Sequence, residues 1–205
     1  MKTFAIIPAA GRSRRMGRPK LLLPWGTTTV IEHVLGVWRA SRVDRVIMVV
    51  HPLDTRLAEL ATAAGAHVIG PTPPPSAMKE SVRIALAFAA ESRPQPSDAW
   101  LLAPADMPGL SAATIDALID AYEAGLRRGG QASQIWAPRC RGKRGHPVLL
   151  SWSLADEVPR LAAHEGLNAL VGRHPVEYVE AAEDSVFEDF DTPEDYERLR
   201  ARHGL

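Results

Sequence analysis

Residues 4–20 read FAIIPAAGRSRRMGRPK, so a short apolar run leads directly into a basic loop that contains glycine. The run Phe4–Ile7 has the length of a buried parallel strand, and turn and polar residues follow it at once. The loop is basic although the Lys+Arg and Asp+Glu counts of the 205-residue chain are both 24. A buried strand followed by such a loop indicates an α/β fold with an anion site at the end of its first strand.

The same alternation of strand and helix continues along the chain. Further strands are expected at Val46–Val50 and Trp100–Ala103, and later ones at Trp136, Val148–Leu150 and Val176–Val179. Apolar residues recur at helical spacing from Ile31 to Trp38, from Val82 to Ala89 and from Ile115 to Tyr122, with Ser111 as the expected cap of the third helix. This order predicts one Rossmann-like, doubly wound, mostly parallel sheet in a single domain over residues 1–205. Ligands bind beyond the carboxyl ends of such strands. The candidate site loops therefore follow Ile7 and Ala103 and lie near Val148.

Composition limits the classes of partner. The formal net charge is zero and 46% of the residues are apolar, which argues against nucleic acid or a membrane as partner. The single cysteine, Cys140, excludes an intramolecular disulfide, and no stretch approaches the length of a membrane span or a signal peptide. We expect a cytoplasmic protein.

The loop chemistry suits a triphosphate. Backbone N–H groups beside Gly11 can converge on an anion, Arg12 and Arg15 can grip phosphate oxygens, and Lys20 adds a compact charge. The stretch is neither Gly-x-x-x-x-Gly-Lys-Ser/Thr nor Gly-x-Gly-x-x-Gly, which argues against a P-loop NTPase or a dinucleotide enzyme. A solvated basic loop, or a docking patch for an acidic partner, is the alternative.

Two carboxylates are candidate metal ligands. Asp106 follows the strand Trp100–Ala103 on a turn bounded by prolines, where one Asp is enough to begin a Mg²⁺ site. Asp191 is the second candidate. Either Asp191 or Thr192 can instead simply cap the final helix, with Pro193 in its first turn.

Arg144 and His146 form a further candidate site. Gly145 and Pro147 constrain the backbone around the imidazole, which can hydrogen-bond a phosphate or act as a general base. Pro71–Pro75 is interpreted as a spacer, and Cys140 as an inert thiol.

Residues 9–23 resemble the signature of the MobA-like nucleotidyltransferases, and most closely that of the molybdenum cofactor cytidylyltransferase branch. The stretches around Ser81, Asp106, His146 and Asp191 resemble that family too. The resemblance implies nucleotide binding by Ala9, Ala10, Gly11, Arg12, Ser13, Lys20 and Ser81, catalysis by Arg15, Lys20 and Asp106, acceptor contacts at Arg144 and His146, and Mg²⁺ (or Mn²⁺) held by Asp106 and Asp191.

The expected reaction is transfer of a nucleoside monophosphate to a phosphorylated acceptor with release of pyrophosphate. The pair Ala9-Ala10 resembles cytosine users rather than guanine users, which implies CTP, with a molybdopterin-type cofactor as acceptor and a molybdoenzyme as possible recipient. The chain departs from the family at His164–Asn168, where an arginine-bearing segment is missing. GTP, a phosphorylated sugar or polyol acceptor, and a nucleotide-binding regulatory module without transfer therefore stay open, as does the oligomeric state.

Overall fold

One eight-stranded sheet forms the centre of the computed structural model, which describes residues 1–128, 134–181 and 184–205. Its strands are β1 (Thr3–Ala9), β4 (Arg45–Val50), β5 (His67–Ile69), β6 (Ala99–Leu102), β7 (Ile135–Cys140), β8 (Lys143–Arg144), β9 (Val148–Ser151) and β10 (Val176–Glu180). They lie in the order β10-β7-β9-β6-β1-β4-β5, and β8 pairs with β7 outside this path. β9 runs antiparallel to β6 and β7, β8 runs antiparallel to β7, and the other pairs are parallel, which confirms the predicted sheet.

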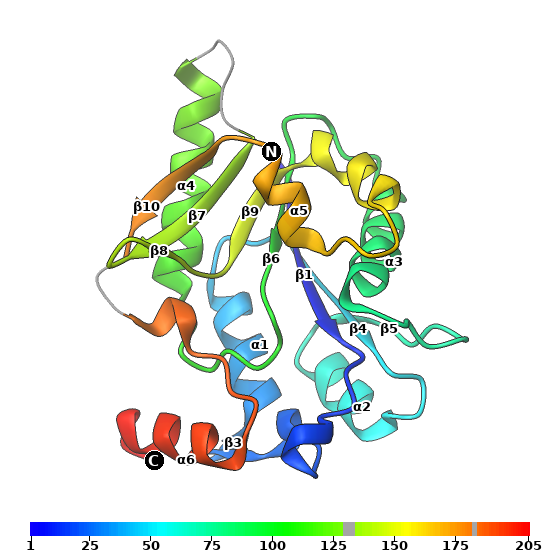
Figure 1. Ribbon diagram of the computed structural model, residues 1–205, viewed down its shortest axis with the longest axis vertical. Coiled ribbons are helices and arrows are strands. Elements are labelled where there is room, and N and C mark those ends of the chain that lie inside the picture. The colour runs from blue at the N-terminus through cyan, green and yellow to red at the C-terminus, as the bar shows by residue number, and fades with distance from the viewer. Residues whose placement is uncertain (129–133, 182–183) are drawn as a thin grey trace.

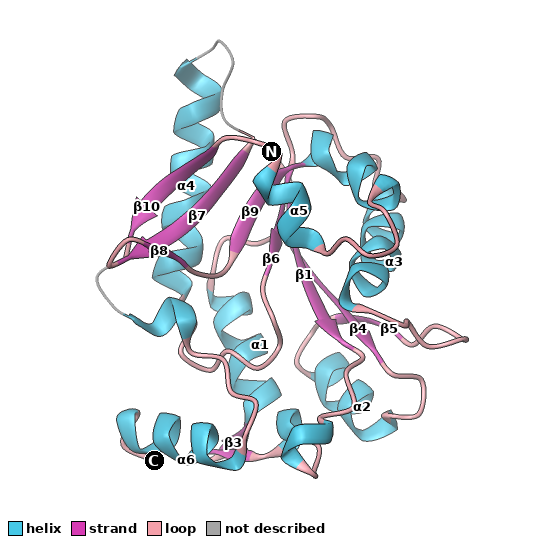
Figure 2. Ribbon diagram, in the orientation of Figure 1, coloured by secondary structure: helices cyan, strands magenta, loops and turns pink. Residues whose placement is uncertain are grey.

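Helices cover both faces of this sheet (Figures 1 and 2). The α-helices are α1 (Val30–Ala40), α2 (Thr55–Ala63), α3 (Met78–Ala90), α4 (Ala112–Arg128), α5 (Leu167–Gly172) and α6 (Pro193–Arg202). Short 3₁₀ segments are η1 (Arg14–Met16), η2 (Lys20–Leu22), η3 (Trp152–Arg160) and η4 (Asp184–Phe187), and β2 (Pro24–Trp25) pairs with β3 (Thr28–Thr29) in a separate hairpin.

The core is divided by the sheet into two apolar clusters. Alternate residues of β1 enter different clusters, with Ala5 and Ile7 in one and Phe4 and Ile6 in the other, as the period of a strand requires. The first cluster contains residues of α1, α2, α4 and α6, and the second contains residues of α3, η3 and α5. Burial of both faces explains why these strands are apolar along their whole length.

The elements expected from the sequence are present. Each expected strand lies within β1, β4, β6, β7, β9 or β10 to within one residue, and the three periodic stretches lie in α1, α3 and α4. The Oγ of Ser111 accepts a hydrogen bond from the backbone N–H of Thr114 at 3.2 Å, which confirms the predicted cap of α4.

The strand order places a ligand site beside β1. Successive strands β1, β4 and β5 run toward one edge of the sheet, whereas β6 lies on the other side of β1. This reversal is a topological switch point, where ligands bind beyond the carboxyl ends of the strands. The loops that follow β1 and β6 flank it. Because β9 is antiparallel, its first residue, Val148, pairs with Leu102 at the same edge of the sheet.

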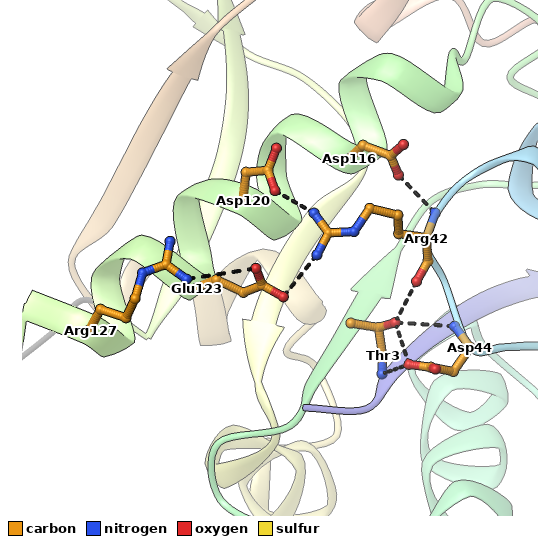
Figure 3. A network of polar contacts seen from close by, with 7 residues as sticks. All are labelled: Thr3, Arg42, Asp44, Asp116, Asp120, Glu123 and Arg127. Carbon is orange, nitrogen blue, oxygen red and sulfur yellow. Dashed lines mark hydrogen bonds and ion pairs between the residues drawn. The ribbon is translucent and has the colours of Figure 1, made fainter.

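A polar network ties the elements at the opposite, amino edge of these strands (Figure 3). The guanidinium of Arg42 contacts Asp120 and lies 2.9 Å from a carboxylate oxygen of Glu123, both on α4. Asp44 accepts a hydrogen bond from the backbone N–H of Thr3 at 2.7 Å, where β1 begins. The network joins α4 to the starts of β1 and β4, so we interpret it as architectural.

Among the described residues, no helix is both long and apolar enough to cross a membrane.

Candidate active site

The loop after β1 folds back on itself. Ala9 ends the strand, and Ser13 has a positive φ of 45° that turns the chain. The carbonyl of Ser13 accepts a hydrogen bond from the backbone N–H of Met16 at 3.0 Å, and its Oγ accepts one from the backbone N–H of Lys20 at 3.4 Å. Met16 is buried in the core. The loop is therefore anchored at its middle and its end, while Gly11 and Arg12 are exposed.

Gly11 occupies open space. A Cβ built on Gly11 would meet no heavy atom within 4 Å, so packing within the protein does not explain why this position lacks a side chain. Gly17 differs, because its φ of 65° is a backbone conformation that favours glycine. Close approach of a ligand to the backbone is a physical reason for glycine at position 11.

Lys20 stands at the centre of a buried polar cluster. Its ammonium donates to the carboxylate of Asp106, to the backbone carbonyl of Phe190 at 2.9 Å and to Asp191 Oδ1 at 3.0 Å. The side chains of Lys20 and Asp106 are only 16% and 12% exposed. Arg15 adds a second cation, with its guanidinium 2.8 Å from Asp191 Oδ2. The structure thus brings four of the predicted site residues together.

The carboxylates of Asp106 and Asp191 stabilise the protonated form of Lys20. Burial by itself lowers the pKa of Lys20, but Asp106 and then Asp191 more than offset this effect, so the pKa is raised above its ordinary value. Lys20 is an ammonium ion throughout the physiological pH range. The cluster therefore presents oxygen atoms to a cation that sits among them.

The loop that carries Asp106 is fixed on both sides. Ala105 and Met107 are buried in the core. His33 Nε2 lies 3.0 Å from the carbonyl oxygen of Pro108, which anchors the loop to α1. Asp106 is therefore held rigidly at the carboxyl end of β6.

Thr192, not Asp191, caps α6. The Thr192 side chain accepts a hydrogen bond from the backbone N–H of Asp195 at 3.2 Å, and the Asp195 carboxylate accepts one from Thr192 N–H at 3.2 Å. This reciprocal arrangement is a capping box. Of the two capping alternatives left by the sequence, the structure selects Thr192, and the carboxylate of Asp191 is directed to Lys20 and Arg15.

Asp189 is a third carboxylate that the motifs did not identify as a site residue. Burial raises its pKa, and the negative charges of Asp106 and then Asp191 raise it further. The pattern Asp-Phe-Asp at residues 189–191 was the available signal, because alternate residues of an extended segment share a side. The negative charge of Asp189 also acts on His146, whose pKa it raises against the larger lowering by burial.

His146 lies at the same edge of the sheet. Its Nδ1 is 3.4 Å from the carbonyl oxygen of Leu102, the last residue of β6. Burial lowers the pKa of His146, so the imidazole is neutral at pH 7. A Cβ at Gly145 would lie 2.7 Å from the Val186 carbonyl oxygen and 2.6 Å from its side chain. The glycine before His146 is therefore required for packing.

The remaining predicted residues lie apart from this cluster. Arg144 donates to Asn168 Oδ1 at 2.7 Å, on α5. Ser81 lies in the first turns of α3 and is 3% exposed. Arg12 is exposed, and Ala9 and Ala10 lie at the end of β1, near the switch point.

Asp106 and Asp191 are the residues best placed to hold a divalent cation. Within the described ranges, no three His, Cys, Asp or Glu side chains form a metal-binding group on their own. Mg²⁺ and Mn²⁺ sites at phosphates commonly use one or two carboxylates and complete their coordination with water and phosphate oxygens. The oxygens that surround Lys20 Nζ fit that kind of ion.

Known proteins share the fold described above. Residues 5–178 match the MobA-like NTP transferase domain. Rv0371c from Mycobacterium tuberculosis has a similar crystal structure, with a TM-score of 0.77, 31% identity and 98% of each chain covered. A structure of Rv0371c with manganese gives a TM-score of 0.76 at 29% identity, covering 98% of this chain and 99% of that one.

Two curated relatives carry names from different reaction classes. Nicotine blue oxidoreductase from Paenarthrobacter nicotinovorans is 25% identical over 95% of this chain and 94% of its own length. A 2-C-methyl-D-erythritol 4-phosphate cytidylyltransferase from Neisseria gonorrhoeae is 45% identical over 65 residues, which are 30% of this chain and 28% of the relative. The domain match covers most of the chain, and a full-length structural relative shares its fold. The chain belongs to the MobA-like NTP transferase family.

Proposed function

We propose that this protein transfers CMP from CTP to a phosphorylated small-molecule acceptor and releases pyrophosphate. The observation that carries the proposal is the cluster of Lys20, Asp106 and Asp191 at the switch point, directly beside the basic loop that follows β1. Cations for a triphosphate and carboxylates for a divalent metal meet there from three distant parts of the sequence.

The chemistry is an in-line displacement. A phosphate oxygen of the acceptor forms a bond to the α-phosphorus of CTP, while the bond from that phosphorus to the bridging oxygen of pyrophosphate breaks. The backbone N–H of Gly11 and the cations of Arg12, Arg15 and Lys20 stabilise the leaving pyrophosphate. Ser13 holds the loop through Lys20, and we place Ser81 beside the nucleotide. The acceptor phosphate is already anionic, so positioning rather than proton removal dominates. A neutral His146 suits this positioning of the acceptor, since it can hydrogen-bond the acceptor phosphate without acting as a base.

Asp106 and Asp191 would hold Mg²⁺ or Mn²⁺. When bound, the ion would neutralise charge on the phosphate oxygens. Lys20 Nζ lies among the same oxygens, so in the loaded site its ammonium would contact the triphosphate as well as these carboxylates.

The small residues Ala9 and Ala10 support a pyrimidine base, because their methyl groups narrow the space at the end of β1. The Neisseria cytidylyltransferase among the relatives also supports CTP as the nucleotide. GTP is the first alternative.

A molybdopterin-type cofactor is our proposed acceptor, with delivery of the product to a molybdoenzyme, and a phosphorylated sugar or polyol is the alternative. The Neisseria relative, a 2-C-methyl-D-erythritol 4-phosphate cytidylyltransferase, supports the alternative.

Pyrophosphate release with Mg²⁺ or Mn²⁺ tests the proposal. CTP, GTP, ATP and UTP are compared, each with molybdopterin cofactor, with 2-C-methyl-D-erythritol 4-phosphate and without acceptor. We expect release with CTP only, and only with an acceptor. Nucleotide binding without release under every condition would instead favour a regulatory module, and turnover of nicotine blue without pyrophosphate release would favour a redox enzyme.

A further inference from the structure

A pocket lies beside the candidate active site, next to the segment that carries Asp189 and Asp191. It has a volume of about 270 Å³ and is bounded by the turn between β7 and β8, by the segment after η4 and by α6. Figure 1 shows these three parts on the same side of the molecule, with η4 between the hairpin and α6. Four cations surround this pocket, namely Arg141, Lys143, Arg198 and Arg202, and its carboxylates are Glu188 and Asp189.

The charge balance of the pocket favours an anion. Glu188 is neutralised within the protein, because Arg202 lies 3.0 Å and His203 2.9 Å from its carboxylate oxygens. Arg198 forms an exposed pair with Asp195 at 2.7 Å, and such a pair exchanges readily with solvent. Lys143 is exposed and has no ion-pair partner among the described residues. Lys143 is therefore a cation at the pocket that is available to an anion.

Strand geometry decides which cations of the hairpin face the pocket. Cys140 pairs with Lys143, and Arg139 pairs with Arg144, so each pair shares one face of the sheet. Cys140 and Lys143 line the pocket beside Leu199, which belongs to the cluster of α1, α4 and α6. Arg144 instead reaches Asn168 on α5, and Arg139 contacts Glu180 on β10. Lys143 and Arg144 thus point to opposite faces.

The pocket adjoins the reaction centre through Asp189. This residue lines the pocket, and the carbonyl oxygen of the next residue, Phe190, accepts a hydrogen bond from the ammonium of Lys20 at 2.9 Å. An anionic acceptor that approaches Asp106, Asp189 and Asp191 meets repulsion and needs compensating cations. Arg144 does not supply such a cation to the pocket, because its side chain lies on the opposite face of the sheet and donates to Asn168.

We propose that this pocket is the acceptor subsite, and that Lys143, together with Arg141 and the cations of α6, binds a phosphate monoester there. The inference rests on the proposed function, because it assigns the acceptor side of the same transfer. Asp189 lines the pocket two residues before Asp191, so the pocket adjoins the segment that contributes a carboxylate to the Lys20 cluster.

The test uses the full-length protein and glycerol 3-phosphate, followed by ³¹P NMR line broadening. Lys143→Glu is compared with wild type, with Arg144→Glu on the opposite face, and with Arg56→Glu, an exposed charge-matched change on α2. We expect Lys143→Glu to weaken binding about tenfold, as loss of a charge-assisted contact implies, and Arg56→Glu to bind within about twofold of wild type. Arg144→Glu tests the other face of the hairpin, and its loss is expected to be smaller than that of Lys143→Glu. Thermal melts verify that each variant is folded.

Three outcomes would overturn the inference. These are equal binding by wild type and Lys143→Glu, a larger loss in Arg144→Glu than in Lys143→Glu, and binding of inorganic phosphate with exclusion of the monoester. CTP binding with Mn²⁺ is measured on the same samples. If the wild type does not bind CTP but Lys143→Glu still weakens glycerol 3-phosphate binding, only the proposed function is wrong. If the wild type binds CTP and Lys143→Glu binds glycerol 3-phosphate normally, only the assignment of the pocket is wrong.

Discussion

The ammonium of Lys20 donates a hydrogen bond to the carboxylate of Asp106, which lies 86 residues further along the chain. The two residues come from the loops after β1 and β6, the neighbouring strands at which the strand order reverses. Both side chains are largely buried, so their attraction is less screened than that of a surface pair. Asp191 completes the contact from a segment 171 residues away from Lys20.

Removal of Lys20 should increase the affinity for a divalent cation in the absence of nucleotide. Lys20 and the ion compete for the oxygens of Asp106 and Asp191, so Lys20→Met leaves those oxygens to the ion alone. Electron paramagnetic resonance of free Mn²⁺ measures the binding. We expect tighter Mn²⁺ binding in Lys20→Met, together with a loss of turnover of at least about 100-fold. Weaker Mn²⁺ binding than wild type would show that the two carboxylates are not the ion's ligands.

Gly11→Ala should separate ligand binding from stability. The new methyl group meets no protein atom within 4 Å, so the free energy of unfolding should be unchanged or raised by about 0.4–1 kcal/mol. CTP affinity should fall about tenfold, because the methyl group stands where the phosphates approach the backbone. Urea denaturation and calorimetric titration with CTP measure the two effects. Unchanged CTP affinity would move the phosphates away from Gly11.

Asp191 and Thr192 should have separable effects. Thr192→Ala removes the side-chain cap of α6 and should lower the free energy of unfolding by about 1 kcal/mol, with CTP affinity retained. Asp191→Asn keeps the cap and should lower turnover with little change in stability. Denaturation and pyrophosphate release on both variants distinguish the roles, and a reversed pattern would make Asp191 the structural residue.

Part of the loss of stability at mildly acidic pH should depend on His146. Burial holds its pKa below the ordinary value of about 6.5, so the unfolded chain binds this proton more readily than the folded one. The stabilisation is complete above about pH 6.5 and declines as pH falls toward the folded-state pKa. His146→Gln should therefore show a shallower decline between pH 7.5 and pH 5 in urea denaturation. His33, whose pKa burial also lowers, stays in both proteins and leaves a residual slope. An equal slope in both proteins would contradict the assignment.

The sequence predicted the parts of the fold that carry strong periodicity. β1, β4 and β6 are almost continuously apolar, and β1 and β6 flank the switch point. β5 was missed because it has only three residues, His67–Ile69, at the edge of the sheet. α2 was missed because only Leu57 and Ala61 are buried along its nine residues, which is too few for a clear stripe.

The candidate site was predicted unevenly for a physical reason. Motifs identify the residues on loops that follow core strands, and these include Lys20, Asp106 and Asp191. They do not tell which face of a two-residue strand a side chain occupies. The neighbours Lys143 and Arg144 therefore look equivalent in the sequence, whereas the pairing of β7 with β8 sends them to opposite sides of the sheet.

Pyrophosphate release by Asp106→Asn is the most direct measurement of whether the Lys20 cluster catalyses nucleotidyl transfer. Asp106→Asn keeps the size of the side chain and removes its charge, and Asp120→Asn on the exposed face of α4 is the matched control. Both are assayed with CTP, Mg²⁺ and acceptor beside the wild type. The account predicts release by wild type and Asp120→Asn, and a loss of at least about 100-fold in a folded Asp106→Asn protein. Release by Asp106→Asn at the wild-type rate would contradict it.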